Sequence, residues 1–212
     1  MPAPSNDREI ELELLVEPGQ LDGLLQRLEA GSNAFPARAP QLLESRFFDT
    51  ADRRLRGRGV SLRVRRVGDR FVQTLEARSE AGGAHTVRGE WECDVASMAP
   101  DLEAIVDATA LERLGVVLPE ELAFVFATRV ERRVVLVEQP VPEAPPAIIE
   151  VAFDKGDIVV GDVGDAGAGT GDQRGEPIAE VELELKAGST RGLYDLLGDL
   201  RTWAPVQVAV GD

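Results

Sequence analysis

Polar and apolar residues alternate along the stretch "REIELELLV" at residues 8–16. Successive side chains of an extended strand face opposite sides, so Glu9, Glu11 and Glu13 would share one face and the apolar residues between them the other. The apolar face is typical of packing against a core. Three carboxylates on the opposite face indicate a surface that attracts cations.

The same alternation returns in seven later segments, most of them separated by short turns that contain glycine. These segments are "LLESRFFDT", "VSLRVRR", "RFVQTLEAR", "HTVRGEWECDV", "FATRVERRVVLV", "AIIEVAFDKGDIVVG" and "IAEVELELKAG". Helical periodicity predicts helices at "PGQLDGLLQRLEAG", "PDLEAIVDATALERLG" and "STRGLYDLLGDLRTWA". The order of strands, helices, strands and a final helix predicts an α+β fold with one antiparallel sheet that is closed or nearly closed.

Charged residues recur two positions apart within these strands. The sets that share a face are Arg63 with Arg65, Arg88 with Glu90 and Glu92, Glu150 with Asp154, and Glu180 with Glu182, Glu184 and Lys186. One interpretation is a sheet whose polar face meets solvent. The other is a barrel with the charged faces inside, because about eight strands leave room for side chains or one small ligand. The second interpretation predicts that these faces converge with the glutamates of the first strand.

The length, charge and amino-acid composition of the chain limit the functions that we expect of it. The chain has 212 residues, of which 43% are hydrophobic and 29% charged, and this suits one folded domain over residues 1–212. A formal net charge of -15 argues against a DNA-binding protein. One cysteine and one histidine leave only oxygen ligands for a metal. We see no apolar run suited to a membrane span or a leader, so we expect a cytoplasmic protein without membrane contact.

Carboxylates gathered in a channel would need cations. Close carboxylates raise one another's pKa unless a cation joins them. Mg²⁺ or Mn²⁺ accepts carboxylate oxygens while keeping coordination positions for water and phosphate. Lys155 and Lys186 are the only lysines, so the basic residues are almost all arginines. A guanidinium group can donate hydrogen bonds to two phosphate oxygens at once. Together these parts suit metal-dependent chemistry on a phosphorylated small molecule.

Several blocks of sequence, in order and spread over most of the chain, resemble the CYTH family, also called triphosphate tunnel metalloenzymes. They are "EIELELL", "FFDTADRRLRGRGVSLRVRR", "RFVQTLEAR" with "GGAHTVRGEWE", "IIEVAFDKG" and "EPIAEVELEL". The resemblance implies an eight-stranded antiparallel β tunnel with flanking helices. It also implies divalent-metal-dependent hydrolysis of a triphosphate or related phosphorylated small molecule. Members act on inorganic triphosphate, thiamine triphosphate, RNA 5′ ends or, in a cyclase subset, ATP.

The resemblance also implies roles for individual residues. Glu9 and Glu11 match the acidic pair of the family's opening Glu-x-Glu-x-Lys signature and would bind metal and take part in catalysis. Arg63 and Arg65 match its Arg-x-Arg phosphate clamp and would also be catalytic. Further metal ligands are expected at Asp154, Glu180 and Glu182, and further substrate contacts at Arg88, Arg132 and Lys186.

Two positions depart from the family pattern. Glu13 stands where the signature has its lysine, and Glu76 follows "QTL" where a lysine is usual. Each replacement makes the tunnel more acidic, and a like-charge contact at about 4 Å costs on the order of 4 kcal/mol at an effective dielectric of about 20. We therefore expect weak inorganic triphosphatase activity, and stronger triphosphate binding after Glu13→Lys with Glu76→Lys. Two alternatives stay open: a catalytically lapsed binding or regulatory module, and a CYTH-fold enzyme with a less anionic substrate.

Overall fold

The computed structural model of the protein describes residues 6–31, 33–78, 86–159 and 175–209, with the backbone alone at 6–9 and 86–88. Its strands are β1 (Asn6–Val16), β2 (Gln41–Thr50), β3 (Val60–Val67), β4 (Arg70–Arg78), β5 (Thr86–Val95), β6 (Leu122–Val141), β7 (Ala144–Val159), β8 (Pro177–Ala187) and β9 (Val206–Val208). The α-helices are α1 (Leu21–Glu29), α2 (Arg54–Gly57), α3 (Ala108–Leu114) and α4 (Arg191–Trp203), and short 3-10 helices lie at Pro18–Gln20, Leu102–Ala104 and Pro119–Glu121.

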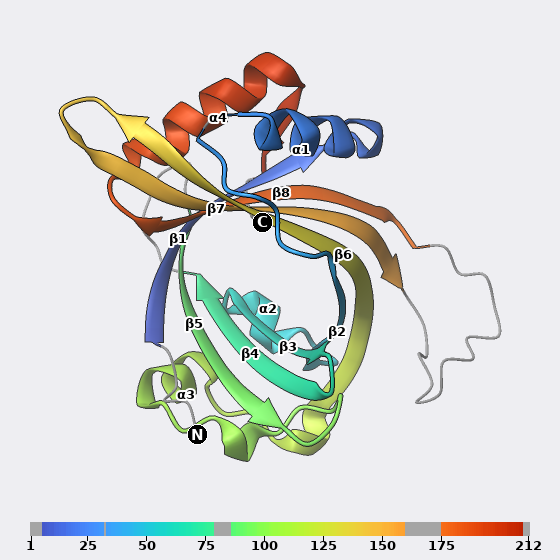
Figure 1. Ribbon diagram of the computed structural model, residues 1–212. Helices are drawn as coiled ribbons and strands as arrows, with labels where there is room; N and C mark the ends of the chain where they lie inside the picture. The colour runs from blue at the N-terminus through green and yellow to red at the C-terminus, as the bar shows by residue number, and fades with distance from the viewer. Residues whose placement is uncertain (1–5, 32, 79–85, 160–174, 210–212) are drawn as a thin grey trace.

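These strands form one antiparallel sheet with the order β5-β4-β3-β2-β6-β7-β8-β1-β9. Strand β1 joins the two sides of this order, because its residues from Asn6 to Glu11 pair with β5 and those from Glu11 to Leu15 pair with β8. The sheet therefore returns on itself (Figure 1). The predicted closed or nearly closed antiparallel sheet is confirmed, with nine strands in the described residues rather than eight, because the short β9 pairs with the end of β1.

Strand β8 shows how alternation in the sequence directs side chains to the two faces of the sheet. Val181 and Leu183 are fully buried on the outer face, within the largest hydrophobic cluster. Glu180, Glu182 and Glu184 alternate with them and lie on the inner face. The inner face is polar because the outer face is the one that packs against helices.

The larger hydrophobic core lies between two helices, α1 and α4, and the outer face of β1, β6, β7 and β8 (Figure 1). The Arg27 guanidinium of α1 lies 5.1 Å from the ring centroid of Trp203 in α4, which links the two helices at their edge. As the sequence predicts, α1 buries one apolar face, which consists of Leu21, Leu24, Leu25 and Leu28.

A smaller core covers the outer face of β3, β4 and β5 with α2 and α3. The sequence predicts one helix over residues 100–115, but the structure has a 3-10 helix at Leu102–Ala104 and then the separate α3. Asp107 explains the break, because its side chain accepts hydrogen bonds of 2.9 Å from the backbone N–H groups of Thr109 and Ala110 and so starts a new helix. Among the helices of the described residues, none has the length and apolar composition needed to cross a membrane.

Candidate active site in the tunnel

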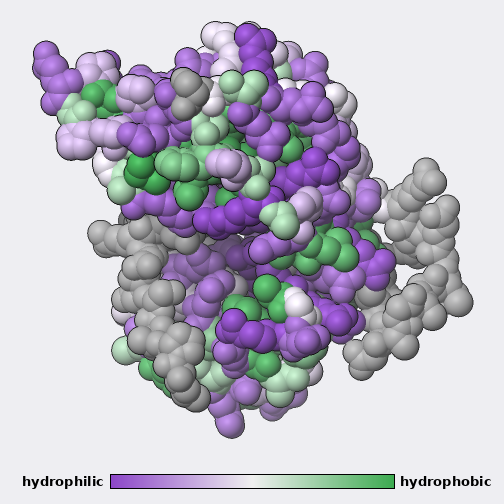
Figure 2. Space-filling model, viewed as in Figure 1, coloured by the Kyte–Doolittle hydropathy of each residue, from purple (hydrophilic) through white to green (hydrophobic). Residues whose placement is uncertain are grey.

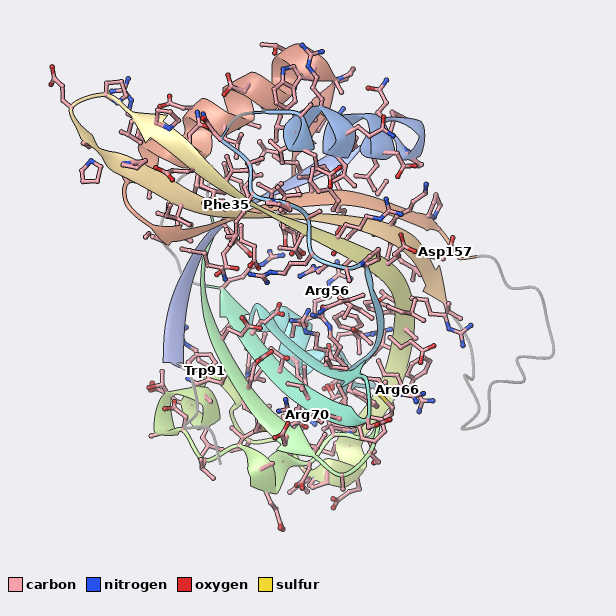
Figure 3. All side chains as sticks on the ribbon, viewed as in Figure 1. Phe35, Arg56, Arg66, Arg70, Trp91 and Asp157 are labelled. Atoms are coloured by element: carbon pink, nitrogen blue, oxygen red, sulfur yellow. The ribbon has the colours of Figure 1, made fainter. Side chains whose placement is uncertain are left out.

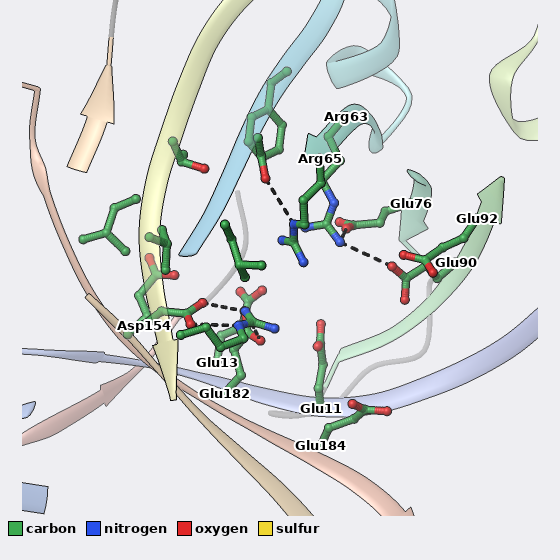
Figure 4. A pocket seen from close by; sticks show the side chains of 18 residues that line it. Glu11, Glu13, Arg63, Arg65, Glu76, Glu90, Glu92, Asp154, Glu182 and Glu184 are labelled. Atoms are coloured by element: carbon green, nitrogen blue, oxygen red, sulfur yellow. Dashed lines mark hydrogen bonds and ion pairs between the residues drawn. The ribbon is translucent and has the colours of Figure 1, made fainter. Parts of the chain in front are cut away.

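Polar faces of the sheet meet around a cavity of about 330 Å³ inside the tunnel. Figure 2 shows hydrophilic side chains around the central hollow, and Figure 4 shows the cavity from close by. Charged side chains reach it from β1, β3, β4, β5, β6, β7 and β8, so the predicted convergence of charged faces is confirmed. The lining residues are Glu11, Glu13, Leu43, Ser45, Phe47, Arg63, Arg65, Glu76, Glu90, Glu92, Thr128, Val130, Arg132, Asp154, Ile178, Glu180, Glu182 and Glu184.

Negative charge dominates this cavity. Nine carboxylate side chains and three arginines line it, so with every group ionised the nine less three leaves a formal excess of six negative charges. Carboxylates confined in this way favour bound cations or protonated carboxyl groups. An anionic ligand would therefore depend on the three arginines and on any cation that enters with it.

Arg63 of β3 holds two of these carboxylates. Its Nη2 atom lies 3.0 Å from Oε1 of Glu76 and 3.4 Å from Oε1 of Glu90. The two glutamates face each other directly across the β4–β5 ladder, so sheet register brings both to the same guanidinium. Glu76, at a position where the resemblance implies a lysine, thus neutralises part of the predicted phosphate clamp.

Arg132 of β6 forms a second cluster. Its Nε atom donates a 2.8 Å hydrogen bond to Asp154, and its Nη2 atom lies 2.7 Å from Oε2 of Glu182. Burial alone would lower the pKa of Arg132, but Glu182 and Asp154 outweigh that effect and raise the pKa. Asp154 and Glu182, which the sequence predicts as metal ligands, are therefore both engaged by an arginine in this structure.

Arg65 of β3 is held by a neutral group instead. Its Nε atom donates a 3.1 Å hydrogen bond to Oγ of Ser45, and within the described residues no carboxylate lies at ion-pair distance from its guanidinium. Its pKa is lowered to about 10, first by burial and then by repulsion from Arg63 and Arg132. A buried cation in this position is stabilised by any anion that enters the cavity.

Glu13 influences neighbouring carboxyl groups of β8. It lies directly opposite Glu182 in the β1–β8 ladder. The pKa of Glu182 is raised to about 7, chiefly by burial, with Asp154 and Glu13 adding to the rise and Arg132 opposing it. The pKa of Glu180 is also raised, by burial and then by Glu13. Glu13 thus favours protonation of Glu180 and Glu182.

Carboxylates that could bind a divalent cation line the cavity, but the described side chains do not form a complete metal site. Glu11 and Glu184 face each other across the β1–β8 ladder and line the cavity on the wall across from Arg63 and Arg65 (Figure 4). Opposed carboxylates are unfavourable unless a cation joins them, and Lys186 already forms an ion pair with Glu184. Among the described side chains no three potential ligands are arranged to hold a metal ion, and Glu9 is described by its backbone alone. The donor chemistry fits Mg²⁺ or Mn²⁺, with Glu11 and Glu184 as the residues to hold it.

Two residues of the predicted charged faces, Lys186 and Glu150, are not part of the cavity lining, and the side chain of a third, Arg88, is not described. Lys186 is exposed at the end of β8, where it forms an ion pair with Glu184 and lies 3.9 Å from Glu150. Glu150 is also 3.3 Å from Arg38, and neither Glu150 nor Lys186 lines the cavity. Arg88 lies opposite residue 9 in the β1–β5 ladder, but its side chain is outside the described residues.

Two residues of β2 were missed by sequence reasoning. Ser45 positions Arg65, and Phe47 stacks on Phe126 with ring centroids 4.4 Å apart and an interplanar angle of 13°. They lie two positions apart in "LLESRFFDT", so alternation could have placed them together on the inner face. The stacking partner depends on the β2–β6 register, which no short sequence pattern fixes.

Comparisons with known proteins agree with this geometry. A family model described as the CYTH domain matches residues 7–205. A candidate adenylate cyclase from Bacillus halodurans has a solved structure with a TM-score of 0.62 and 18% sequence identity, covering 98% of this chain and 95% of that one.

Two further solved structures share the fold. A candidate adenylyl cyclase from Hippeastrum, described as having a dominant triphosphatase activity, gives a TM-score of 0.56 at 17% identity over 96% of this chain and 92% of that one. A chain of the Schizosaccharomyces pombe Mediator head module gives 0.55 at 8% identity over 94% of this chain and 98% of that one. At these identities the structures establish a common fold.

Proposed function

The chain belongs to the CYTH domain family, and we propose that it hydrolyses a triphosphate or related phosphorylated small molecule inside the tunnel with a divalent metal ion. The family binds phosphorylated small molecules and is generally dependent on Mg²⁺ or Mn²⁺. The description of the Hippeastrum protein as a triphosphatase supports the same class of reaction.

Arg65 is the observation that supports this proposal best. It presents a guanidinium inside an acidic cavity, with Ser45 as its hydrogen-bond partner and no carboxylate at ion-pair distance among the described residues. A guanidinium left in this state matches a phosphate oxygen, which can accept two of its N–H groups at once. Arg63 lies beside it and could contribute part of its charge once Glu76 or Glu90 is displaced or protonated.

The charged residues on opposite walls of the cavity would have different roles. Arg65 and Arg63 would orient the phosphate chain from one wall, and Glu11 and Glu184 would hold the cation from the other. A bound Mg²⁺ or Mn²⁺ would supply positive charge for the phosphate oxygens and a coordinated water. Glu182, whose pKa is raised to about 7, is the carboxyl group best suited to accept and return a proton near neutral pH.

A phosphate-release assay tests this function. Inorganic triphosphate, thiamine triphosphate and nucleoside triphosphates would each be incubated with the protein and Mg²⁺ or Mn²⁺. We expect release from at least one of them that requires the metal and is lost in Arg65→Gln. Arg70→Gln is the matched control, because Arg70 is an exposed arginine that pairs with Asp94 away from the cavity. Folded protein that releases nothing across the panel would contradict the proposal.

A lapsed binding module is the second candidate, and one observation favours it. Arg63 and Arg132 are each already neutralised by two carboxylates, which leaves less positive charge for a phosphate chain. The same fold occurs in a chain of the Mediator head module. Tight binding of a triphosphate without any phosphate release would select this candidate.

A further inference from the structure

Three carboxylates form a row across the adjacent strands β1, β8 and β7. Glu184 of β8 lies directly opposite Glu11 of β1 on one side and directly opposite Glu150 of β7 on the other. Directly opposite residues of antiparallel strands project from the same face of the sheet, so these three side chains share the inner face. We refer to them as the carboxylate row. Like charges at such positions are unfavourable unless a cation joins them.

A bulge in β8 places Lys186 beside this row. The β7–β8 register shifts between Ile148 and Ile149, and the shift leaves Lys186 as the extra residue of β8. Bulges of this kind re-aim a side chain and are common next to active sites. The Nζ atom of Lys186 forms an ion pair with Oε2 of Glu184 and lies 3.9 Å from Oε1 of Glu150. The chain therefore supplies a cation of its own to two members of the row.

Glu150 has a second cationic partner, which comes from the segment before β2. The Nη1 atom of Arg38 lies 3.3 Å from Oε2 of Glu150. Figure 3 labels Phe35, which lies in the same segment. The backbone N–H groups of Phe35 and Arg38 donate hydrogen bonds of 2.8 Å and 2.9 Å to carbonyl groups of β6, so the segment is held along that strand. Glu150 thus keeps a counter-charge even if Lys186 changes its position.

A divalent cation at Glu184 would meet the ammonium group of Lys186. Positive charges that share one carboxylate repel each other, so the metal and the lysine compete for Glu184. The Lys186 side chain is 39% exposed and carries its charge on a flexible four-carbon stem, which allows it to leave. Glu150 is already near the ammonium group and offers it a place to go.

From this arrangement we infer that Lys186 is a resident counter-cation of the carboxylate row, which pairs with Glu184 in metal-free protein and is displaced toward Glu150 when Mg²⁺ or Mn²⁺ binds. The lysine then has two effects. It stabilises the row while no metal is bound, and it lowers the affinity for the metal by the cost of breaking the ion pair. The inference rests on the proposed function, because it takes Glu11 and Glu184 as the residues that hold the cation.

Calorimetric titration of Mn²⁺ into chelator-treated protein at low salt tests the inference. Lys186→Gln removes the competing ammonium group and should raise the affinity about threefold to fivefold, the scale of one partly exposed ion pair. Lys155→Gln is the matched control, because it removes the same charge from the only other lysine, which pairs with Asp22 and does not line the cavity. It should leave the affinity unchanged. Lys186→Arg keeps a cation and should stay within twofold of wild type.

Melting temperatures separate this role from that of an ordinary ion pair. With a chelator, Lys186→Gln should melt below wild type, because the row has lost its counter-cation. With saturating Mn²⁺ the difference should shrink, because the metal has displaced the lysine in wild type as well. A difference of the same size with and without metal would mean that Lys186 stabilises the fold without competing with the metal, and it would overturn the inference.

A double variant ties the effect to the carboxylate for which lysine and metal compete. Glu184→Gln combined with Lys186→Gln should lose the gain in affinity. A gain that survives in the double variant, or Lys186→Gln that binds Mn²⁺ no more tightly than Lys155→Gln, would overturn the inference and leave the proposed metal dependence standing. Binding by Lys186→Gln but not by wild type would support the inference. If neither protein binds Mn²⁺, the inference and the proposed metal-dependent function fail together.

Discussion

The guanidinium of Arg63 lies 3.0 Å from the carboxylate of Glu76, so the residue expected to depart from the family pattern is the direct partner of an arginine proposed to bind phosphate. Glu76→Lys would therefore place an ammonium group beside Arg63 rather than simply remove a negative charge. A neutral replacement separates these effects. It also distinguishes Glu76 from Glu13, which faces carboxyl groups.

We expect Glu76→Gln to strengthen binding of the inorganic imidotriphosphate analogue about fivefold. The substitution releases one of the two ion pairs of Arg63, and a partly exposed pair is worth on the order of 1 kcal/mol. Calorimetric titration at fixed Mg²⁺ and low salt measures the change. Asp94→Asn is the matched control, because Asp94 pairs with exposed Arg70 outside the cavity. An unchanged affinity in folded Glu76→Gln would show that Arg63 does not contact the anion.

Arg65→Gln should raise the stability of the unliganded protein and weaken its binding of the anion. The unliganded variant should melt about 2–4 °C higher, because about 1 kcal/mol of desolvation and repulsion is removed from a chain of this size. Its affinity for the imidotriphosphate analogue should fall at least tenfold, since a hydrogen bond to a charged group contributes about 1.5–3 kcal/mol. Thermal melts and titrations of the same sample measure both. A variant that melts lower and binds normally would remove Arg65 from the site.

The free energy of unfolding of metal-free protein should fall as pH rises from about 4.5 to 7. Glu182 has a folded-state pKa of about 7, above its ordinary value of 4.5, so the folded state keeps the proton over this range while the unfolded state loses it. The full loss, on the order of 3 kcal/mol, is present above pH 7. Urea unfolding with a chelator at pH 5 to 8 measures it. Glu182→Gln should flatten this dependence, and a variant with the wild-type slope would contradict the assignment.

Arg132→Gln should destabilise the protein by about 3 kcal/mol at neutral pH, because it leaves the buried Asp154 and the partly buried Glu182 without their cation. Adding Asp154→Asn and Glu182→Gln to the same chain should recover most of that loss. Chemical unfolding at pH 7.5 gives the free energies. Arg133→Gln is the matched control at the next residue, where an exposed arginine pairs with Glu131. Equal losses in Arg132→Gln and Arg133→Gln would argue against a buried cluster.

Mg²⁺ or Mn²⁺ should raise the melting temperature, and the rise should depend on Glu11 and Glu184. A ligand at about 100 times its dissociation constant adds about 2.7 kcal/mol to folding. Glu11→Gln and Glu184→Gln should each reduce the shift that millimolar metal produces, whereas Glu103→Gln, on the short Leu102–Ala104 helix, should not. Scanning calorimetry with and without chelator measures the shift. A melting temperature indifferent to metal would contradict the cation site.

Alternation in the sequence predicts the face on which a residue lies, and this was sufficient for Glu13, Arg63 and Glu182, all of which line the cavity. It does not predict how far along the tunnel a residue lies. Lys186 is on the same face of β8 as Glu182, yet it lies outside the lining, where it pairs with Glu150 and with the lining residue Glu184.

The position of a residue along the tunnel depends on strand register, and contacts between segments far apart in the chain set that register. The Arg63–Glu76 and Arg132–Glu182 pairs follow from such registers, and so does the stacking of Phe47 on its partner in β6. The sequence therefore shows the fold and most of the charged inner face. It does not show which charges neutralise one another.

Glu11 and Glu184 meet across one ladder although they are 173 positions apart in the chain (184 less 11). Strand β1 is synthesised well before its partner β8, so the tunnel can close only after β8 has been made. Contacts this distant in sequence make closure a slow step of folding. A nascent chain that has not reached β8 would carry the carboxylates of β1 without those of β8, so the proposed cation site would form only once both strands are present.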